Sequence, residues 1–266
     1  MGFGTTVDLT YGAPKKTGTI KYRPLETRGV TPNGAVFYYA RNGATALLAN
    51  RLVQAKAPQG TTQSVGLTPS TAIGDWTAAA GITTGKRNIG VVWATAHSSG
   101  EYTDGYLTVE TTPGSGMYRI SADADGGNSA TATIITLHPD DPLQVATLTT
   151  VSKLALTHNP YSSVIVSIAS TQTNLIVGVT PVPVAIGEYF WLQTYGLCAV
   201  VYDSAVAVVA GKKVVGGVGT TAGEVQGAAI TSATALTQAN APTIGYFTSA
   251  IPTAGDLIQM MLTIRA

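Results

Sequence analysis

The sequence predicts an all-β fold, built from antiparallel β-sandwich or barrel units and carrying an extended N-terminal arm. Three observations support this prediction. Thr, Val, Ala and Gly dominate the 266 residues, and 30 Gly and 13 Pro are spread along the chain. Short runs of β-branched and aromatic residues recur between turn residues, mostly with a period of two. Long stretches of Leu, Glu and Lys, which build helices, are few.

Eight runs have the composition and length of strands. In chain order they cover residues 36–39, 89–93, 106–109, 117–120, 134–137, 164–168, 189–193 and 260–264. Their spacing is typical of a sandwich or barrel. Two short helices are expected, at 44–52 and 233–240, and the first of these segments is equally compatible with a turn that leads into a strand.

A local pattern occurs four times: a small or apolar residue, then Gly or Asn, then one or two polar residues, then the apolar start of a strand. The Gly or Asn of each copy is Asn50, Gly187, Gly211 or Gly255. Because Gly and Asn tolerate positive φ, each copy predicts a tight turn that begins a strand. We therefore expect a sheet built from many hairpins.

The chain is longer than a typical single domain, which allows one large β-sandwich or two smaller β units. Residues 1–20 lack strong apolar periodicity and predict an extended N-terminal arm. Residues 58–74 are polar and rich in turn residues, which indicates a long surface loop. A further break falls at 158–161, where Asn-Pro favours a turn. We therefore place a first β unit at 21–160 and a second at 161–266.

Charged residues make up only 11% of the chain, against about 25% in a typical globular protein. This deficit favours burial of the surface against partners, although a surface solvated by Thr, Ser, Gln and Asn is the alternative. The 15 basic and 14 acidic residues provide no basic field, so no direct contact with nucleic acid is expected. No apolar segment reaches the about 18 residues of a membrane span, so no membrane partner is expected either.

The sequence contains no convincing signature of catalysis, so the chain is predicted not to be an enzyme. Its three histidines, His97, His138 and His158, lack the spacing of a zinc site. The single cysteine, Cys198, stands in an apolar run and is expected in the core. No catalytic residue, cofactor or metal is therefore assigned.

Two acidic segments have simple explanations as turns. Residues 123–128 alternate carboxylates before a glycine, but Ile134 occupies the position where a calcium loop needs Glu. Asp140 and Asp141 stand between two prolines and predict a turn. A deep cleft that gathers His138 with these two aspartates would instead indicate an enzyme.

Several segments resemble virion proteins of tailed bacteriophages. Residues 157–166 read Thr-His-Asn-Pro-Tyr-Ser-Ser-Val-Ile-Val, and residues 187–196 read Gly-Glu-Tyr-Phe-Trp-Leu-Gln-Thr-Tyr-Gly. Ile-Gly-Tyr at 244–246 and Ala-Gly-Asp-Leu-Ile at 254–258 precede the last apolar strand, and 104–107 with 117–120 extend the similarity upstream. It covers roughly 85–266 and more loosely 30–56. The family indicated is that of head-decoration, or cement, proteins.

The resemblance implies a structural role on the outer surface of the phage head. There the protein would stabilise contacts between major capsid proteins and associate with itself, most simply as a homotrimer, after synthesis in the bacterial cytoplasm. The residues that we single out for these interfaces lie in the basic arm (Lys15, Lys16, Lys21, Tyr22 and Arg23) and on one strand (Tyr189, Trp191 and Gln193). Alternate side chains of that strand are expected to face a core and a neighbouring subunit.

Two other virion roles stay open at this point. A tail or fibre protein would recognise a host glycan with Trp and Tyr platforms, and a tail-tube protein is the third alternative. Whatever the role, Trp93 and Trp191 are expected to be buried among apolar neighbours. Residues 1–30 are expected to be disordered in the free protein and ordered on the particle, because they lack a core-forming pattern.

Overall fold

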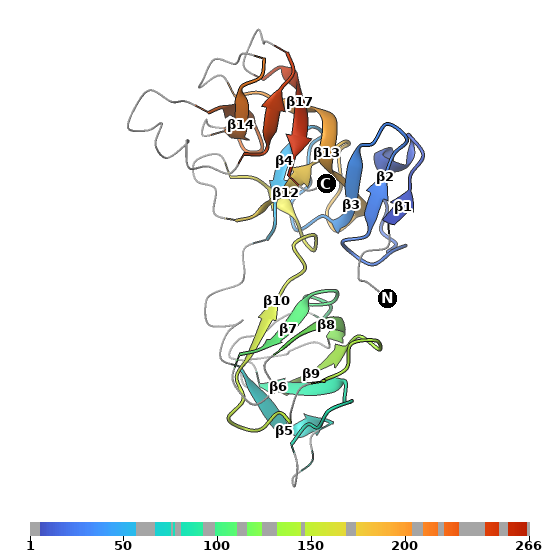
Figure 1. The fold of residues 1–266 in the computed structure, drawn as a ribbon, viewed down its shortest axis with the longest axis vertical. Coiled ribbons are helices and arrows are strands. Elements are labelled where there is room, and N and C mark those ends of the chain that lie inside the picture. Colours follow the sequence, from blue (N-terminus) through green and yellow to red (C-terminus); the bar gives the residue numbers. More distant parts are fainter. Residues whose placement is uncertain are drawn as a thin grey trace, which may run out of the picture. The chain divides into compact units, whose positions relative to one another are not determined.

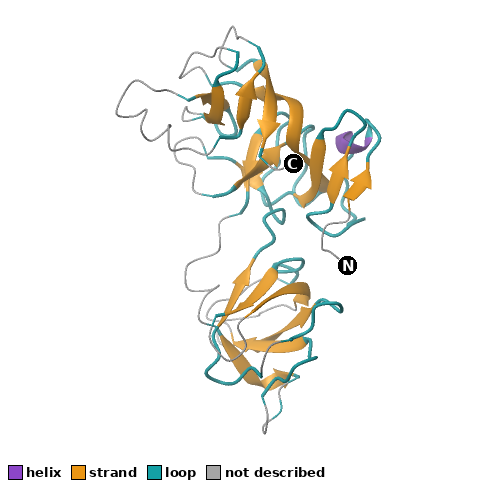
Figure 2. Cartoon of the chain, viewed as in Figure 1, coloured by secondary structure: helices purple, strands orange, loops and turns teal. Residues whose placement is uncertain are grey.

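A computed structural model of the chain confirms the all-β fold (Figures 1 and 2). The structure describes residues 6–56, 67–75, 77, 81–92, 99–110, 116–123, 132–144, 147–168, 174–203, 210–217, 221–228, 243–249 and 255–264. Within these ranges the only helix is η1 (Ala13–Lys15), a single 3-10 turn. The helix expected at 44–52 is absent, and a turn leads into a strand there instead; the one expected at 233–240 lies outside the described residues.

The chain forms two compact units. We call Pro58–Asn159 the inserted unit, and Gly2–Ala57 together with Pro160–Ala266 the host unit. The break expected near 160 is a unit boundary, but the prediction that 21–160 forms one unit is wrong. Residues 21–57 pair with strands that follow residue 160: β3 (Val36–Arg41) is hydrogen-bonded along β13 (Tyr189–Val201). Such pairing between distant segments leaves no mark in local composition.

The inserted unit is a barrel. Its strands are β5 (Thr68–Gly74), β6 (Asn88–Val92), β7 (Tyr106–Val109), β8 (Gly116–Asp123), β9 (Ala132–Leu137) and β10 (Leu154–Thr157). They form an antiparallel sheet in the order β10-β7-β8-β9-β6-β5. Leu67, next to β5, exchanges two backbone hydrogen bonds of 2.8 and 3.0 Å with Leu154 of β10. This bridge joins the two edges of the sheet and closes it.

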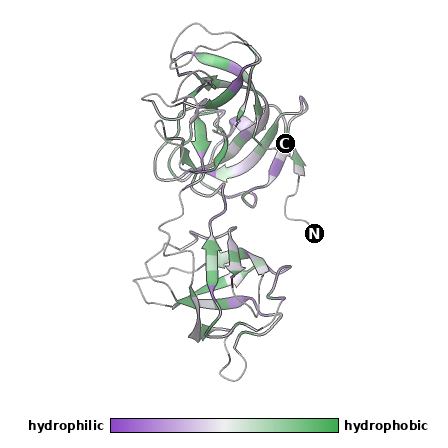
Figure 3. Cartoon of the chain, turned by 60° about the vertical axis from the view of Figure 1, so that its left-hand side comes forward, coloured by the Kyte–Doolittle hydropathy of each residue, from purple (hydrophilic) through white to green (hydrophobic). Residues whose placement is uncertain are grey.

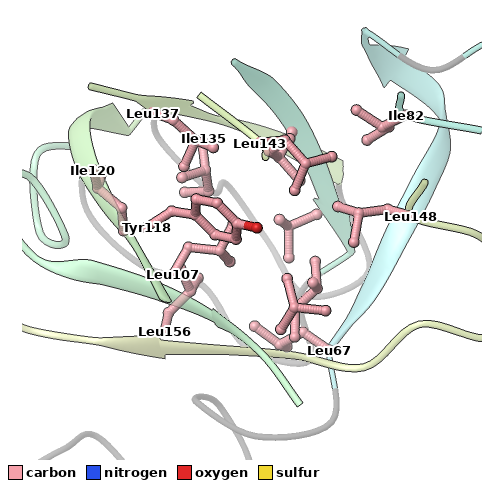
Figure 4. Packing of buried hydrophobic residues seen from close by; sticks show 14 of the residues in the cluster. Leu67, Ile82, Leu107, Tyr118, Ile120, Ile135, Leu137, Leu143, Leu148 and Leu156 are labelled. Carbon is pink, nitrogen blue, oxygen red and sulfur yellow. The ribbon is translucent and has the colours of Figure 1, made fainter. Parts of the chain in front are cut away.

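The barrel interior is filled by apolar side chains from all its sides. In β9 every second residue is buried, so that Ile135 and Leu137 point inward. Figure 4 shows these two side chains meeting Leu107, Tyr118 and other members of the cluster in the centre. Residues that face the interior alternate with residues that face outward along the strand, as in a closed barrel. The inserted unit therefore has a core of its own.

The host unit contains the longer sheet. Its other strands are β1 (Thr6–Asp8), β2 (Arg28–Val30), β4 (Leu52–Gln54), β11 (Ile165–Val166), β12 (Ile176–Val179), β14 (Lys213–Gly216), β15 (Val225–Gly227), β16 (Gly245–Phe247) and β17 (Leu257–Thr263). The main path runs β1-β2-β3-β13-β17-β16-β14-β15, and β12, β4 and β11 branch from β13. The first half of β13 pairs with β3 and its second half with β17. In Figure 1 the blue β3 lies beside the orange β13.

Strand β3 is buried on both faces, which explains its unbroken apolar sequence. One face packs Tyr38 and Ala40 against Phe190 and neighbouring residues of the host core. The opposite face carries Phe37 and Tyr39, next to Trp191 of the paired strand β13. The N-terminal segment covers this face, with Leu9 and Leu25 in the same cluster.

The prediction of a separate N-terminal arm over residues 1–20 is therefore wrong for residues 6–20. β1 pairs in parallel with β2, Leu9 is buried, and η1 places a buried proline, Pro14, against the unit. The segment has few apolar residues, but these pack on the large aromatic face of Phe37, Tyr39 and Trp191 and bury it. Disorder of residues 1–30 is likewise contradicted for 6–30, and residues 1–5 lie outside the described chain.

The four predicted strand-starting turns are confirmed. Asn50, Gly187, Gly211 and Gly255 all have positive φ, between 58° and 85°. Each stands two residues before a strand, namely β4, β13, β14 and β17. Figure 3 shows the apolar stretches lying on the strands of both units.

Candidate functional site

A hollow opens on the host unit where the N-terminal segment crosses β13. Gly18 forms an isolated antiparallel bridge with Tyr189, with N···O distances of 3.1 and 2.7 Å. The cavity beside it has a volume of about 190 Å³ and is lined chiefly by Lys16, Ile20, Tyr22, Arg23, Tyr39, Tyr189 and Trp191. We call it the aromatic hollow. Most of its lining comes from two segments far apart in the sequence, the basic stretch near the N-terminus and the start of β13 at Tyr189.

The floor of the hollow is a cluster of three aromatic rings. Tyr39 stacks on Tyr189 at a centroid distance of 5.8 Å and an interplanar angle of 11°. Its other neighbour is Trp191, at 5.2 Å and a tilt of 60°. Ring pairs of this kind contribute about 0.5–1.5 kcal/mol beyond the burial of their area.

Tyr39 also ties the N-terminal segment to the floor. Its hydroxyl accepts a hydrogen bond from the backbone N–H of Tyr22, with an N···O distance of 3.3 Å, and donates to the carbonyl of Ile20 at 3.4 Å. Burial raises the pKa of Tyr39 above its usual value, although the hydrogen bond from Tyr22 acts in the opposite direction. The phenol is therefore neutral at physiological pH and keeps its proton for Ile20.

The rim of the hollow is cationic. Lys16 and Arg23 line it and are exposed, and Lys15 and Lys21 are exposed in the same segment. Residues 11–25 contain these four basic residues and no acidic one. The guanidinium carbon of Arg41 lies 5.7 Å from the centre of the Tyr189 ring, within the range of a cation–π contact. The hollow thus offers an apolar floor beneath positive charge.

Of the eight residues singled out from the sequence, the structure brings five together in this hollow: Lys16, Tyr22, Arg23, Tyr189 and Trp191. Lys15 and Lys21 lie in the same exposed segment. Gln193 is different, because it is buried and its amide donates to the carbonyls of Tyr195 and Leu197, at 3.3 and 3.0 Å. Gln193 therefore supports β13 where its register with β3 shifts, between Gln193 and Tyr195. An interface role for the remaining residues stays a prediction.

Sequence reasoning missed Tyr39, which forms the centre of the floor. The available signal was the run Val36–Tyr39, in which four apolar or aromatic residues follow one another without alternation. Such a run indicates a strand covered on both faces. It does not say which segment provides the second cover.

A second surface lies on the outer face of β13, β17 and β16. Met261 pairs directly with Leu197 on one side and with Tyr246 on the other. These three side chains are 38%, 52% and 48% exposed. Residues directly opposite each other project to the same face of a sheet. Leu197, Met261 and Tyr246 therefore form one apolar row across three strands, which we call the outer row.

The sequence did not reveal the outer row. In β17 buried and exposed residues alternate strictly, and both phases contain apolar residues. Met260 faces the core and Met261 faces outward, although the two have the same side chain. Only the register of the three strands distinguishes them.

The residues that suggested chemistry have structural partners. His158 stacks on Tyr102 with the ring centroids 4.3 Å apart, and its Nδ1 lies 3.0 Å from the carbonyl oxygen of Glu101. Asp123 accepts hydrogen bonds from the backbone N–H of Tyr102 and the hydroxyl of Thr103. Within the described ranges no three His, Cys, Asp or Glu side chains are grouped to hold a metal ion. His97 lies outside those ranges.

No protein-family model, curated protein or solved structure matches this chain. The resemblance to phage virion proteins therefore rests on the sequence motifs given above. In the part of the chain that the structure describes, no helix is long and apolar enough to cross a membrane. The function has to follow from the two surfaces, the aromatic hollow and the outer row.

Proposed function

We propose that the chain is a non-enzymatic structural protein of a phage virion, which decorates the head and binds the major capsid protein through the outer row. The observation that carries this proposal is the exposure of three apolar side chains in line across three strands. Contiguous apolar patches larger than a few hundred Å² are uncommon on soluble monomers, and the largest exposed patch of a protein is often its interaction site. The motifs that resemble those of cement proteins support the major capsid protein as the partner.

The geometry of the outer row suits a flat protein partner. Neighbouring strands are about 4.8 Å apart, so the row is about 10 Å wide from Leu197 to Tyr246. Tyr195, which is 37% exposed, extends it along β13. Aromatic residues and Met are enriched in the buried centres of protein interfaces. The low charge content of the chain, 11%, also reduces the number of charged groups that an interface would desolvate.

Cementing would work by burial of surface across a joint. Apolar area contributes about 25 cal/mol per Å², and a standard interface buries about 1,600 Å² in total. Both units have closed cores of their own, so little ordering is needed on binding. Repetition over many joints of a shell would then resist pressure from within.

The test compares Leu197→Lys with Leu175→Lys on particles that lack the chain. Leu175 is 65% exposed and lies outside the outer row, so it receives the same change without touching the proposed contact. Leu197→Lys is expected to lower affinity for the particle at least about tenfold, because it places a charge at the centre of an apolar contact. The bound fraction is measured by quantitative gel analysis of sedimented particles.

Full occupancy by Leu197→Lys would refute this use of the outer row. Failure of the unmodified chain to bind any particle, together with binding to host-surface glycans, would favour the tail or fibre alternative. A density map of the intact virion locates the chain directly.

A further inference from the structure

We propose that the aromatic hollow of one copy receives the turn His138–Asp141 of the inserted unit of a second copy, with Pro139 against the aromatic floor and the Asp140 carboxylate between Lys16 and Arg23. This inference rests on the resemblance behind the proposed function in one respect only, which is the expectation that copies of the chain associate. It adds the surfaces through which they do so.

The turn is a small, preformed knob. The backbone N–H of Asp141 donates to the carbonyl of His138 at 2.9 Å, which closes a four-residue turn with Pro139 and Asp140 at its centre. Proline suits the second position of such a turn because its ring sets φ. The Asp141 carboxylate accepts the backbone N–H of Arg119 at 2.7 Å and anchors the turn to the barrel.

The outward groups of the turn match the hollow in chemistry. Pro139 is exposed, and the side chain of Asp140 is 70% exposed. Aromatic-lined grooves are a recurrent receptor for proline rings. A carboxylate next to that ring would meet the cationic rim, where both Lys16 and Arg23 are exposed.

The size of the hollow favours a single side chain over a free small molecule. Ligand pockets for small molecules usually measure about 300–1,000 Å³, whereas this hollow measures about 190 Å³. A proline at the tip of a rigid turn needs little room and loses little freedom when it binds. The hollow therefore suits one anchor residue of a protein partner.

The charges of the two units identify a second copy as that partner. The inserted unit has eight acidic and four basic residues, whereas the host unit has six acidic and eleven basic ones. Opposite net charges steer the inserted unit of one copy toward the host unit of another and disfavour contacts between like units. Such a head-to-tail contact closes into a ring or continues as a chain, depending on the rotation between copies.

Charge reversal tests each side of the contact in the full-length chain. Asp140→Lys alters the turn, and the double variant Lys16→Glu with Arg23→Glu alters the rim. Each is expected to weaken self-association at least about tenfold in sedimentation velocity. The controls are Glu110→Lys and Lys212→Glu, which each reverse one charge of the same sign at an exposed residue elsewhere and should behave as the unmodified chain.

Mixing the two altered proteins supplies the decisive measurement. One protein keeps its hollow and the other keeps its turn, so one unaltered contact is available to each unlike pair. The altered turn and the altered rim are also complementary to each other, because the lysine introduced at position 140 would face two glutamates. Equimolar mixing is therefore expected to restore association between unlike copies, although neither altered protein associates with itself. The milder variant Asp140→Asn, which removes only the charge, should give an intermediate loss and shows that misfolding of Asp140→Lys is not the cause.

Unchanged self-association of the charge-reversed proteins would overturn the proposal. An equimolar mixture that associates no more than either altered protein alone would also overturn it, and so would an unmodified chain that is monomeric. Binding of acidic saccharides in the hollow, with self-association intact, would overturn it as well. The virion role is judged separately by Leu197→Lys on particles. If that variant fails to bind while the charge variants associate normally, the role stands and the turn-to-hollow contact falls.

Discussion

Removal of the Trp191 side chain tests whether the N-terminal segment belongs to the fold of the host unit. The side chain is 8% exposed and packs with Tyr39 and the cover formed by Leu9 and Leu25. A buried aromatic residue removes about 150–250 Å² from water, which corresponds to about 4–6 kcal/mol at 25 cal/mol per Å². The neighbouring hollow lets the site relax, so we expect Trp191→Ala to cost about 3–5 kcal/mol.

The matched control is Tyr22→Ala, at the same hollow. Tyr22 is 75% exposed, so its removal is expected to change stability by less than about 0.5 kcal/mol. Urea unfolding followed by far-ultraviolet circular dichroism gives the free energies. Hydrogen exchange with mass spectrometry then compares peptides from β13 and β9, because each reports on one unit.

The expected result for Trp191→Ala is faster exchange in β13 and in residues 6–30, with β9 unchanged. Equal stability of the two variants would refute the reasoning, because it would mean that the N-terminal segment does not cover this face in solution. Loss of protection in β9 alone would refute it too.

Other predictions concern single groups. Gly29→Ala is expected to destabilise the host unit by about 1–3 kcal/mol, because a Cβ there would lie 2.9 Å from Trp191 Cζ3. Gly12→Ala is the control and should leave stability unchanged, because a Cβ at Gly12 has no atom within 4 Å. Thermal unfolding of the two variants measures the difference. Burial raises the pKa of the Cys198 thiol to about 12, so thiol reagents should fail to label the native protein at pH 8 and label it fully in urea. Burial alone would raise the pKa of Asp75. The backbone N–H groups of Asn88 and Arg87 donate hydrogen bonds to its carboxylate, and these bonds lower the pKa overall. The stability that this carboxylate contributes is therefore present above its unfolded pKa and is lost as pH falls through its lower folded pKa. The difference in free energy of unfolding between the unmodified chain and Asp75→Ala should then shrink as pH falls below about 4. A difference that does not depend on pH would contradict this.

Local sequence was sufficient for the features that depend on neighbours along the chain. The positive φ of Asn50 and Gly187 follows from the residue type and from the apolar run that begins two positions later. The β-branched and aromatic runs define where strands lie, because these side chains suit a pleated, half-buried surface. Burial of Trp191 also followed from its apolar neighbours and is confirmed; Trp93 lies outside the described residues.

Pairing between distant segments was beyond local sequence. The host unit joins residues up to 57 to residues from 160 onward, with the inserted unit between them. Because the entropy lost on closing a loop rises only slowly with its length, even so long an insertion adds little to that cost. The polar segment that begins at the first junction, Pro58, was interpreted as a surface loop, so only the boundary near residue 160 was found. The sequence of the basic stretch is likewise typical of a free terminus. Only the structure shows that it packs on the aromatic face formed by β3 and β13.

For the candidate site, the sequence alone identified the residue types: the cations at 15–23 and the aromatic residues at 189 and 191. The tertiary structure alone decided that they share one hollow with Tyr39, and that Leu197, Met261 and Tyr246 stand in one row. The physical reason is that side-chain direction in a strand alternates at every residue. Which face is covered depends on the neighbouring strand and its register, and those are set by the packing of the whole unit.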